Sequence, residues 1–431
     1  MWRDEVVSYD LSRRELPDLA RTLERADAVH GLYYLLVHAL FRLFPGADPL
    51  LVLRLPSVLA VAVTAGLLTL LGARYAGPRA GLLAGLVFAV LPPVQRYAQE
   101  GRSYALVCAL VVWATCLLVR AVDTGTARAW AGYGAVLLTA CLLHEFAVLV
   151  LAAHAVAVPR EARRAWLRAA GAVVAALAPL AVLSMRQSAQ VAWIGGLGAG
   201  ALLGFGGVAL LGCACAAVLP KALVRLALPL TVLPAGLLML VSPAKPLYVD
   251  RYVLYGQAGT ALLAGAALDR LVRAGGPRRA AALLAAGAAI AALLPVTTYL
   301  RTPGSRLDDV TAIGAAVRTA GAGADGILYL PARRRVWSLA DPGTVRGLRD
   351  LALDRTPAAS GTLYGTEAGP SVIRARLLTA HRVVVLRDPV GQPPDPAPGE
   401  VVKRRTLAER FEECGTRTVR GARVSVYARR C

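Results

Sequence analysis

Lysine and carboxylates are scarce in this chain of 431 residues. Aspartate and glutamate number 27 against 48 basic residues, and only three of the basic residues are lysine, namely Lys221, Lys245 and Lys403. The apolar content of 57% and the mean hydropathy of +0.55 exclude a soluble globular protein of ordinary composition. The net charge of +21 could suit nucleic acid. Many arginines, however, stand in short links between long apolar runs, which is typical of membrane proteins, so we expect no nucleic-acid partner.

The seven cysteines show no spacing typical of a metal site. Cys414 and Cys431 lie in the charged C-terminal part of the chain, and an extracytoplasmic location would permit a disulfide between them. Spacing alone leaves a disulfide and two free thiols as equal alternatives. The other five lie in apolar runs, where a thiol is most often a small buried hydrophobe; they are Cys108, Cys116, Cys141, Cys213 and Cys215.

Nine apolar runs are candidates for membrane helices, because a bilayer core about 30 Å thick needs about 20 helical residues. A single helix over residues 129–159 would place the basic link at 160–168 outside, so this run is predicted to be a hairpin broken at His144 and Glu145. Ten spans result, with both ends of the chain on the extracytoplasmic side. The runs are 50–73, 80–95, 103–121, 129–159, 165–184, 198–219, 222–242, 252–272 and 279–299, and the basic links that mark cytoplasmic loops are 74–79, 120–128, 160–168, 221–225 and 270–279.

The expected fold class is an all-α polytopic membrane bundle with a small C-terminal extracytoplasmic α/β domain. Residues 1–46 form a first outer loop whose apolar stretch 31–44 lies on the membrane surface, and residues 47–300 form the multi-span domain. Residues 301–431 form the α/β domain. Within it we expect a helix at 308–320, strands at 327–330, 382–386 and 423–427, and a proline-rich loop at 389–399.

Polar residues gather at the predicted outer ends of the spans, where a site facing outward would lie. Asp4 and Glu5 either are a solvated flank or include a general base, which has to be held close to the hydroxyl that it deprotonates. Arg102 and Arg251 either snorkel to lipid headgroups or bind a lipid-linked phosphate, to which a guanidinium offers two parallel hydrogen bonds.

Histidine and aromatic residues stand at the same ends. His30 and His144 either are satisfied by a neighbouring carbonyl or ligate a metal beside an acid. Trp193, Tyr33 and Tyr34 are by default interfacial aromatics and could equally stack on a sugar.

Several short motifs occur in the order found in a known enzyme family. The strings Trp2-Arg3-Asp4-Glu5 and Asp27-x-x-His30-x-Leu32-Tyr33-Tyr34, with His38, resemble the first outer loop of bacterial family 39 glycosyltransferases. These belong to the GT-C superfamily, alongside protein O-mannosyltransferases and the aminoarabinose transferase of lipid A. Its later motifs resemble Arg54-Leu55-Pro56-Ser57, Gln99-Glu100-Gly101-Arg102-Ser103-Tyr104, His144 and Arg251-Tyr252. The departures are Gly31 and Leu32 in place of two prolines, and Gly101 and Ser103 in place of alanine and methionine.

The resemblance covers about residues 2–270 and implies that a first span precedes the Asp-Glu loop. The sequence has no signal peptide or span before the Asp-Glu loop, so we expect either that the first span is missing from it or that the N-terminus itself is exported. The implied activity is transfer of a sugar, with inversion, from a polyprenyl-phosphate donor to an acceptor hydroxyl on the outer face of the cell membrane. The bias toward Ala, Arg and Leu suggests a GC-rich genome, for which mannose is the expected sugar. The acceptor is a glycan, a glycolipid or a protein.

The resemblance also implies roles for individual residues. Asp4 is the base, and Glu5 orients it, binds acceptor or holds a divalent cation, which is a candidate cofactor. Arg102 and Arg251 bind the donor phosphate. The supporting residues are Asp27, His30, Glu100, which positions Arg102, Tyr104, His144, which contacts the head group, and Tyr252.

Two other classes of protein share the gross features of this sequence. A lipid or polysaccharide transporter would also be basic inside and polar outside, but it would function without Asp4. The inner links here are short and lack the paired intramembrane carboxylates that proton relays use. A non-catalytic membrane scaffold would likewise tolerate Asp4→Asn.

Overall fold

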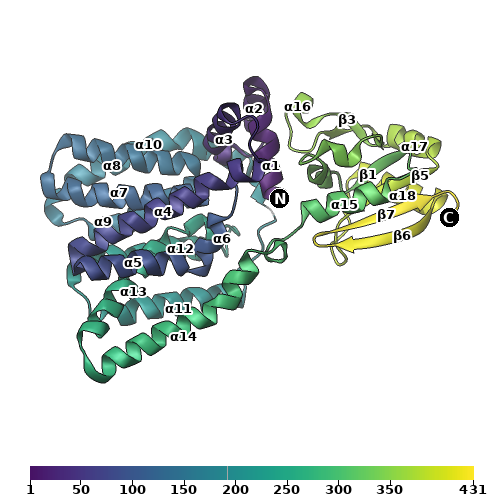
Figure 1. Cartoon of the computed structure of the whole chain (residues 1–431). Helices are drawn as coiled ribbons and strands as arrows, with labels where there is room; N and C mark the ends of the chain where they lie inside the picture. The colour runs from purple at the N-terminus through teal and green to yellow at the C-terminus, as the bar shows by residue number, and fades with distance from the viewer. Residues whose placement is uncertain (192) are drawn as a thin grey trace. The chain divides into compact units, whose positions relative to one another are not determined.

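The computed structural model describes residues 1–191 and 193–431, without the side chains of Ala189 and Arg278. The chain divides into two compact units (Figure 1). The first unit contains residues 1–26, 37–50 and 302–431, and the second contains residues 27–36 and 51–301. The N-terminal segment is therefore grouped with the C-terminal domain, whereas the sequence suggested a separate first loop ending at residue 46.

The second unit is built from helices (Figure 1). Among the described residues, six helices are long and apolar enough to cross a membrane, or seven if the bent pair α5 and α6 is one span. The polytopic bundle expected from the sequence is confirmed, but the count of ten spans is not. In chain order the helices are α4 (Pro49–Ala76), α5 (Pro78–Val90), α6 (Pro92–Ala98), α7 (Tyr104–Thr124), α8 (Ala127–Leu143), α9 (Val150–Ala157), α10 (Arg163–Arg186), α11 (Ala199–Ala216), α12 (Lys221–Val241), α13 (Gly256–Arg273) and α14 (Gly276–Leu300).

Local sequence explains why fewer helices qualify as spans than hydropathy suggested. Pro92 and Pro93 begin α6 and cannot continue the hydrogen bonds of α5, so the two helices meet at 64°. The run 129–159 does break at His144, but α8 and α9 then have only 17 and 8 residues. The last turns of α13 carry Asp269, Arg270 and Arg273.

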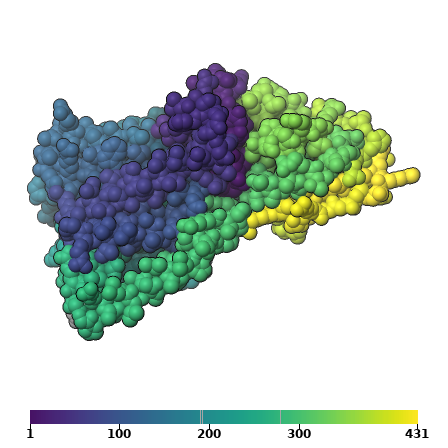
Figure 2. All heavy atoms as spheres, viewed as in Figure 1, coloured from purple at the N-terminus to yellow at the C-terminus, as the bar shows by residue number. Residues whose placement is uncertain are grey.

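Glycine lets α5 and α13 touch along their backbones. A Cβ atom at Gly265 of α13 would lie 2.4 Å from the backbone nitrogen of Ala84 in α5, so no larger residue fits there. Most of α13 is buried by its neighbours. In contrast, only 6% of the apolar window of α14 is buried, and this helix forms an outer ridge of the second unit (Figure 2). Such an exposed apolar helix suits lipid rather than water.

The C-terminal domain contains one mixed sheet with the strand order β2-β1-β5-β7-β6. Strand β1 pairs in parallel with β2 and β5, and β7 is antiparallel to β5 and β6. The elements are α15 (Val310–Ala320), β1 (Gly326–Leu330), β2 (Arg349–Asp350), α16 (Pro357–Ser360), α17 (Pro370–Thr379), β5 (Arg382–Arg387), α18 (Pro398–Arg410), β6 (Glu412–Val419) and β7 (Ala422–Ala428), with a small ribbon of β3 (Leu353–Arg355) and β4 (Thr366–Glu367).

Alternate residues of the central strands bury both faces of this sheet. Leu328, Val383 and Val385 pack with Ile373 of α17 and Leu407 of α18 in one core cluster. The helix and three strands expected here are confirmed as α15, β1, β5 and β7, and the proline-rich stretch is a loop up to the start of α18. The sequence did not reveal β6, because nearly all of its residues are exposed and so it lacks an apolar pattern.

Helices α1 (Arg3–Arg13) and α2 (Leu16–Leu23) and the second half of α3 (Gly31–Leu43) belong to the same unit as this domain. The stretch 31–44 is thus helical as expected. The backbone N–H of Arg3 donates to the Asp308 carboxylate at 2.7 Å, and the Trp337 indole donates to the same carboxylate at 3.0 Å. Asp308 therefore ties the first residues of α1 to the C-terminal domain.

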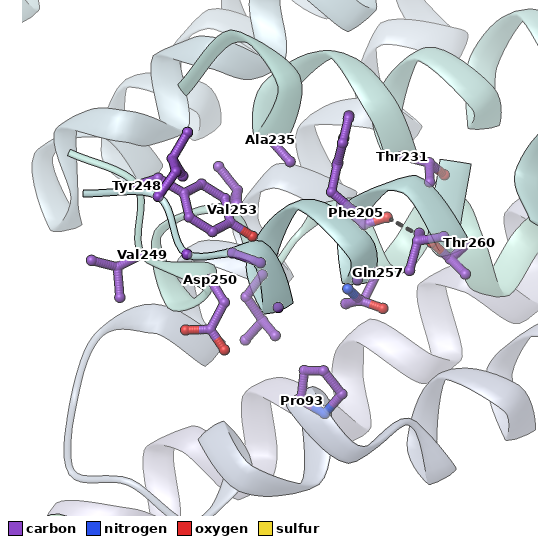
Figure 3. A pocket seen from close by; sticks show the side chains of 18 of the residues that line it. Pro93, Phe205, Thr231, Ala235, Tyr248, Val249, Asp250, Val253, Gln257 and Thr260 are labelled. Atoms are coloured by element: carbon purple, nitrogen blue, oxygen red, sulfur yellow. Dashed lines mark hydrogen bonds between the residues drawn. The ribbon is translucent and has the colours of Figure 1, made fainter. Parts of the chain in front are cut away.

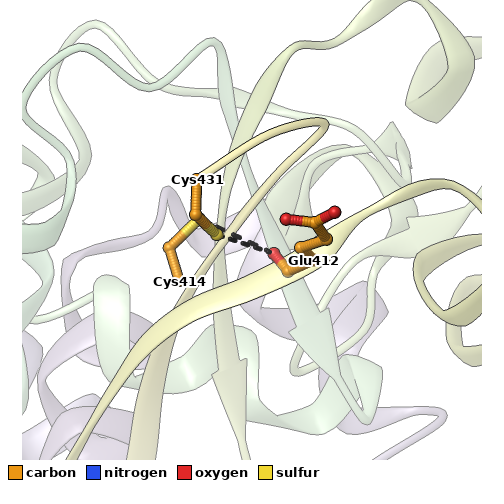
Figure 4. Close-up of a disulfide and its surroundings, with 3 residues drawn as sticks. All are labelled: Glu412, Cys414 and Cys431. Carbon is orange, nitrogen blue, oxygen red and sulfur yellow. Dashed lines mark hydrogen bonds between the residues drawn. A yellow bond between two sulfur atoms is a disulfide. The ribbon is translucent and has the colours of Figure 1, made fainter.

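Cys414 and Cys431 form the disulfide that the sequence left open, with their Cα atoms 5.3 Å apart (Figure 4). It fastens the end of the chain to the edge strand β6. Because the bond closes a loop of 17 residues, we expect Cys431→Ser to lower the free energy of unfolding of this domain by about 3 kcal/mol. Denaturant-dependent hydrogen exchange of β7 amides in the full chain would measure the change. Cys213→Ser on α11 is the control, and equal protection in both variants would contradict the prediction.

Candidate functional site

Four buried aromatic side chains meet in the second unit. His30 ends the short 3₁₀ helix at Ala28–His30, Tyr104 begins α7, His144 follows α8, and Tyr252 lies in the 3₁₀ turn Asp250–Val253. The rings of His144 and Tyr252 are 4.6 Å apart, and His144 lies 5.5 Å from His30 and 5.6 Å from Tyr104. The structure therefore gathers these four predicted residues, which come from four separate segments, into one cluster.

Arg102 lies beside this cluster and is only 6% exposed. Its Nη1 donates to the Tyr34 hydroxyl at 2.9 Å and lies 3.9 Å from the Asp27 carboxylate, to which Tyr34 also donates. Asp27 adopts φ 59°, and it is the one positive φ among the described non-glycine residues. A strained backbone of this kind persists where the surroundings hold it, as at functional sites.

Ser57 of α4 fixes the loop that carries Arg102. Its buried hydroxyl shares its one proton between the carbonyl oxygens of Glu100 at 2.7 Å and Arg102 at 3.2 Å. Glu100 is 1% exposed, and one carboxylate oxygen lies 3.9 Å from Arg96. Sequence reasoning assigned no role to Ser57, although it stands in a string that carries the family resemblance. It treated Tyr34 as an interfacial aromatic or a sugar-stacking ring, whereas the structure shows Tyr34 buried and bonded to Arg102 and Asp27.

Arg251 stands among three aromatic rings. Its guanidinium carbon is 5.4 Å from the centre of the Tyr104 ring, 5.3 Å from that of Trp193 and 5.7 Å from that of Tyr252. The neighbouring Asp250 accepts hydrogen bonds from the Tyr97 hydroxyl and from the backbone N–H of Arg251. Tyr104 thus connects the histidine cluster to Arg251, and two guanidinium groups belong to the site.

A cavity of about 550 Å³ adjoins Asp250 (Figure 3). Its walls are mostly apolar and come from α11, α12 and α13, with Phe205 and Ala235 among them, and Pro93 contributes from α6. Tyr248 and Asp250 bring polar groups to it. Its volume lies in the range of small-molecule sites, and its composition suits a hydrocarbon ligand with a polar end.

Asp4 and Glu5 belong to the first unit, in the first turn of α1. Asp4 is 9% exposed and lies 3.6 Å from the Arg3 guanidinium, whereas Glu5 is fully buried. The Glu5 carboxylate accepts a hydrogen bond from the backbone N–H of Trp2 at 3.3 Å, which closes the start of the helix. That these acids share a cavity with Arg102 and Arg251 stays a prediction.

Across residues 1–191 and 193–431, no three or more His, Cys, Asp or Glu side chains are grouped so as to hold a metal ion. The divalent cation expected as a candidate near Glu5 also stays a prediction.

Comparison with known proteins supports the sequence motifs. Residues 31–188 match the family model of dolichyl-phosphate-mannose-protein mannosyltransferases. The comparison with curated protein sequences finds no match. The crystal structure of ArnT from Cupriavidus metallidurans in the apo state matches with a TM-score of 0.58 at 13% identity, over 98% of this chain and 93% of that chain. ArnT from the same organism bound to undecaprenyl phosphate matches with a TM-score of 0.53 at 15% identity, over 98% and 96%. The GT-C resemblance is thereby confirmed: this chain is a multi-pass membrane protein with the GT-C glycosyltransferase fold.

Proposed function

We propose that this protein transfers a sugar from a polyprenyl-phosphate donor to an acceptor hydroxyl on the outer face of the cell membrane. The observation that carries the proposal is the pairing of two guanidinium groups, Arg102 and Arg251, with a buried cluster of histidine and tyrosine rings. Guanidinium groups bind phosphate through charge and paired hydrogen bonds. The match to a structure bound to undecaprenyl phosphate supports the same donor class.

The apolar cavity beside Asp250 fits the other half of such a donor. An isoprenoid chain needs an apolar surface within the bilayer, and the cavity between α11, α12 and α13 offers one beside Asp250, which precedes Arg251 in the chain. The phosphate would then lie at the polar end of the cavity, near Arg251, while the chain extends among side chains such as Phe205 and Val208.

In the proposed reaction, Asp4 accepts the proton of the acceptor hydroxyl while its oxygen attacks the anomeric carbon. The bond between that carbon and the phosphate oxygen breaks, the configuration inverts, and the negative charge passes to the departing polyprenyl phosphate. Arg102 and Arg251 stabilise this charge as it develops. Glu5 supports Asp4, directly or through a divalent cation, while Asp27 and Tyr34 hold Arg102 in place.

Mannose is the proposed sugar, because the matched family model describes mannosyl transfer to protein. The direct test is transfer of radiolabel from polyprenyl-phosphate mannose, glucose and aminoarabinose to membranes that contain the protein. Membranes without the chain are the control. Label transferred from mannose alone supports the full proposal, whereas transfer from another sugar overturns mannose and keeps the enzyme class. A folded protein that transfers none of the labels contradicts the proposed function.

Arg102→Gln is expected to lower the rate of transfer by about 100-fold, because it removes a fixed charge from the departing phosphate. Glutamine keeps much of the length of the side chain and its capacity to donate to Tyr34. Arg120→Gln at the exposed far end of α7 is the matched control, and its rate should stay near that of the wild type. Equal rates for the two variants would exclude Arg102 from donor binding.

A further inference from the structure

The strand order of the C-terminal domain creates a crevice between β1 and β5. From β1 the chain proceeds to β2 on one side, whereas β5 lies on the other side of β1. The two strands are parallel, so their carboxyl ends meet at one edge of the sheet. Connections that leave such an edge in opposite directions open a crevice, which is where α/β sheets commonly bind ligands.

A pocket of about 250 Å³ lies at this point, and we call it the β1–β5 pocket. Leu330 and Pro331 at the end of β1 line it together with Arg387 and Asp388 at the end of β5, and Leu407 of α18 adds an apolar surface. The volume is below the range for drug-sized ligands, so it suits a single sugar residue or a small charged group.

Charges inside the β1–β5 pocket do not cancel. The Asp388 carboxylate pairs with Arg333 at 2.8 Å and with Arg334, and Asp395 lies 3.6 Å from Arg333. Neither of these two arginines lines the pocket. The acids of the pocket are therefore neutralised from outside it. Arg387, which does line the pocket, is paired with Glu413 at 2.8 Å.

Two further guanidinium groups line the pocket, and their partners are backbone carbonyls. Arg404 donates to the carbonyl oxygen of Asp395 at 2.8 Å, and Arg423 donates to that of Asp388 at 3.0 Å. Among the residues that the structure describes, neither has a carboxylate within ion-pairing distance. Both side chains are half-buried. Their positive charges are thus oriented by the backbone and left for an external anion to balance.

The walls of the pocket are rigid before any ligand arrives. The loop from Pro389 to the start of α18 contains prolines, which restrict its backbone. Behind it, the fully buried Lys403 bonds to the carbonyl oxygen of Tyr329 in β1 at 2.8 Å, and Glu400 accepts from the backbone N–H of Ala332 at 2.8 Å. These contacts fix α18, and with it Arg404, to the end of β1. A preorganised pocket loses little entropy on binding.

We propose that the β1–β5 pocket binds an oxyanion, carboxylate or phosphate, carried by a sugar residue of the acceptor, through Arg404 and Arg423. This assignment rests on the proposed function and on the predicted extracytoplasmic location of the domain, the side on which the acceptor lies. The acceptor is then an anionic glycan or glycolipid rather than a neutral one. The pocket would hold its charged group and leave the hydroxyl to be glycosylated outside.

Binding is tested with the detergent-solubilised full chain by calorimetry, using glucuronate, glucose 6-phosphate and glucose as probes. Both charged sugars, or one of them, should bind at least about tenfold more tightly than glucose, and the stronger of the two identifies the preferred oxyanion. Arg404→Gln with Arg423→Gln should weaken that binding by at least about tenfold. Arg405→Gln, a 73% exposed neighbour on α18, is the matched control and should change it less than about twofold.

Two further measurements keep the outcome decisive. Arg102→Gln should leave binding of the charged sugars unchanged, since a loss there would place the anion at the donor site and overturn the assignment. In the wild type, glucuronate or glucose 6-phosphate should slow hydrogen exchange of the loop amides at 390–392. This measurement does not depend on whether a variant folds. No slowing, or binding that survives in the double variant, overturns the pocket as an anion site.

The transfer assay separates this inference from the proposed function. With the natural membrane acceptor, the double variant should raise the acceptor KM while kcat stays near the wild-type value. An unchanged KM in a variant that no longer binds the charged sugars overturns the acceptor role and leaves the transferase intact. If the wild type transfers no sugar but binds the charged probes, the proposed function and the acceptor role fail together, whereas the anion site stands.

Discussion

Asp4→Asn is expected to lower the rate of sugar transfer by about 100- to 10 000-fold, which is the usual range for loss of a general base. Asparagine has nearly the same shape and still accepts hydrogen bonds, so α1 should form as before. It cannot take a proton from the acceptor hydroxyl. Asp4 lies in the first turn of α1, where the helix dipole favours the ionised carboxylate that a base requires. Transfer from the labelled donor to membranes measures the loss.

Glu15→Gln is the matched control for this experiment, because Glu15 is an exposed acid only eleven positions further along the chain. It should transfer sugar at nearly the wild-type rate. If Asp4→Asn transfers sugar at the wild-type rate, Asp4 is not the base. If neither the wild type nor the variant transfers label, a transporter or a scaffold is favoured. Glu5→Gln is less informative, because the Glu5 carboxylate also closes the start of α1 on the Trp2 backbone.

Sequence reasoning worked best where a short stretch of sequence alone indicates the structure or the role of its residues. Arg102, Tyr104, His144 and Arg251 were expected together because each stands at the end of an apolar run within a family motif, and the structure does gather Tyr104 with His144 and Arg251. Apolar runs likewise revealed β1, β5 and β7, whose side chains are buried on both faces. A local pattern was sufficient in both cases.

Features that depend on distant partners could not be predicted in this way. Asp308 holds Arg3 through a contact that spans 305 positions, and nothing near either residue marks it. At Gly265 the backbone of α13 can approach Ala84 of α5 because glycine has no side chain, and nothing near Gly265 in the sequence marks this contact. Nothing in the sequence distinguishes the arginines of the β1–β5 pocket from the other arginines of the domain. Only the order of the strands brings Arg404 and Arg423 to one edge of the sheet.

A second large effect is expected in the core of the C-terminal domain, where Lys403 is fully buried. Its ammonium group pairs with Glu400 at 2.8 Å and with Glu367 at 2.9 Å. Lys403→Met fills a similar volume but leaves the Glu400 carboxylate without its cation. We therefore expect the free energy of unfolding of the domain to fall by about 3–5 kcal/mol at neutral pH. Denaturant-dependent hydrogen exchange of β1 and β5 amides in the full chain would measure this.

The dependence of this loss on pH separates an uncompensated charge from poor packing. Burial raises the pKa of Glu400 above its ordinary value, and Lys403 opposes that rise, so the pKa should climb further in Lys403→Met. An acid whose pKa is raised in the folded state binds its proton more tightly when folded, so the variant regains stability as pH falls through that pKa toward the ordinary value of about 4.5. A loss of stability caused by poor packing would not change over this pH interval.

Adding Glu400→Gln to Lys403→Met should restore much of the lost stability at neutral pH, since the buried charge is then gone. Arg405→Met on the exposed face of α18 is the control and should cost little stability. If the stability of Lys403→Met is restored neither by lowering the pH nor by adding Glu400→Gln, Lys403 matters for its volume and not for its charge.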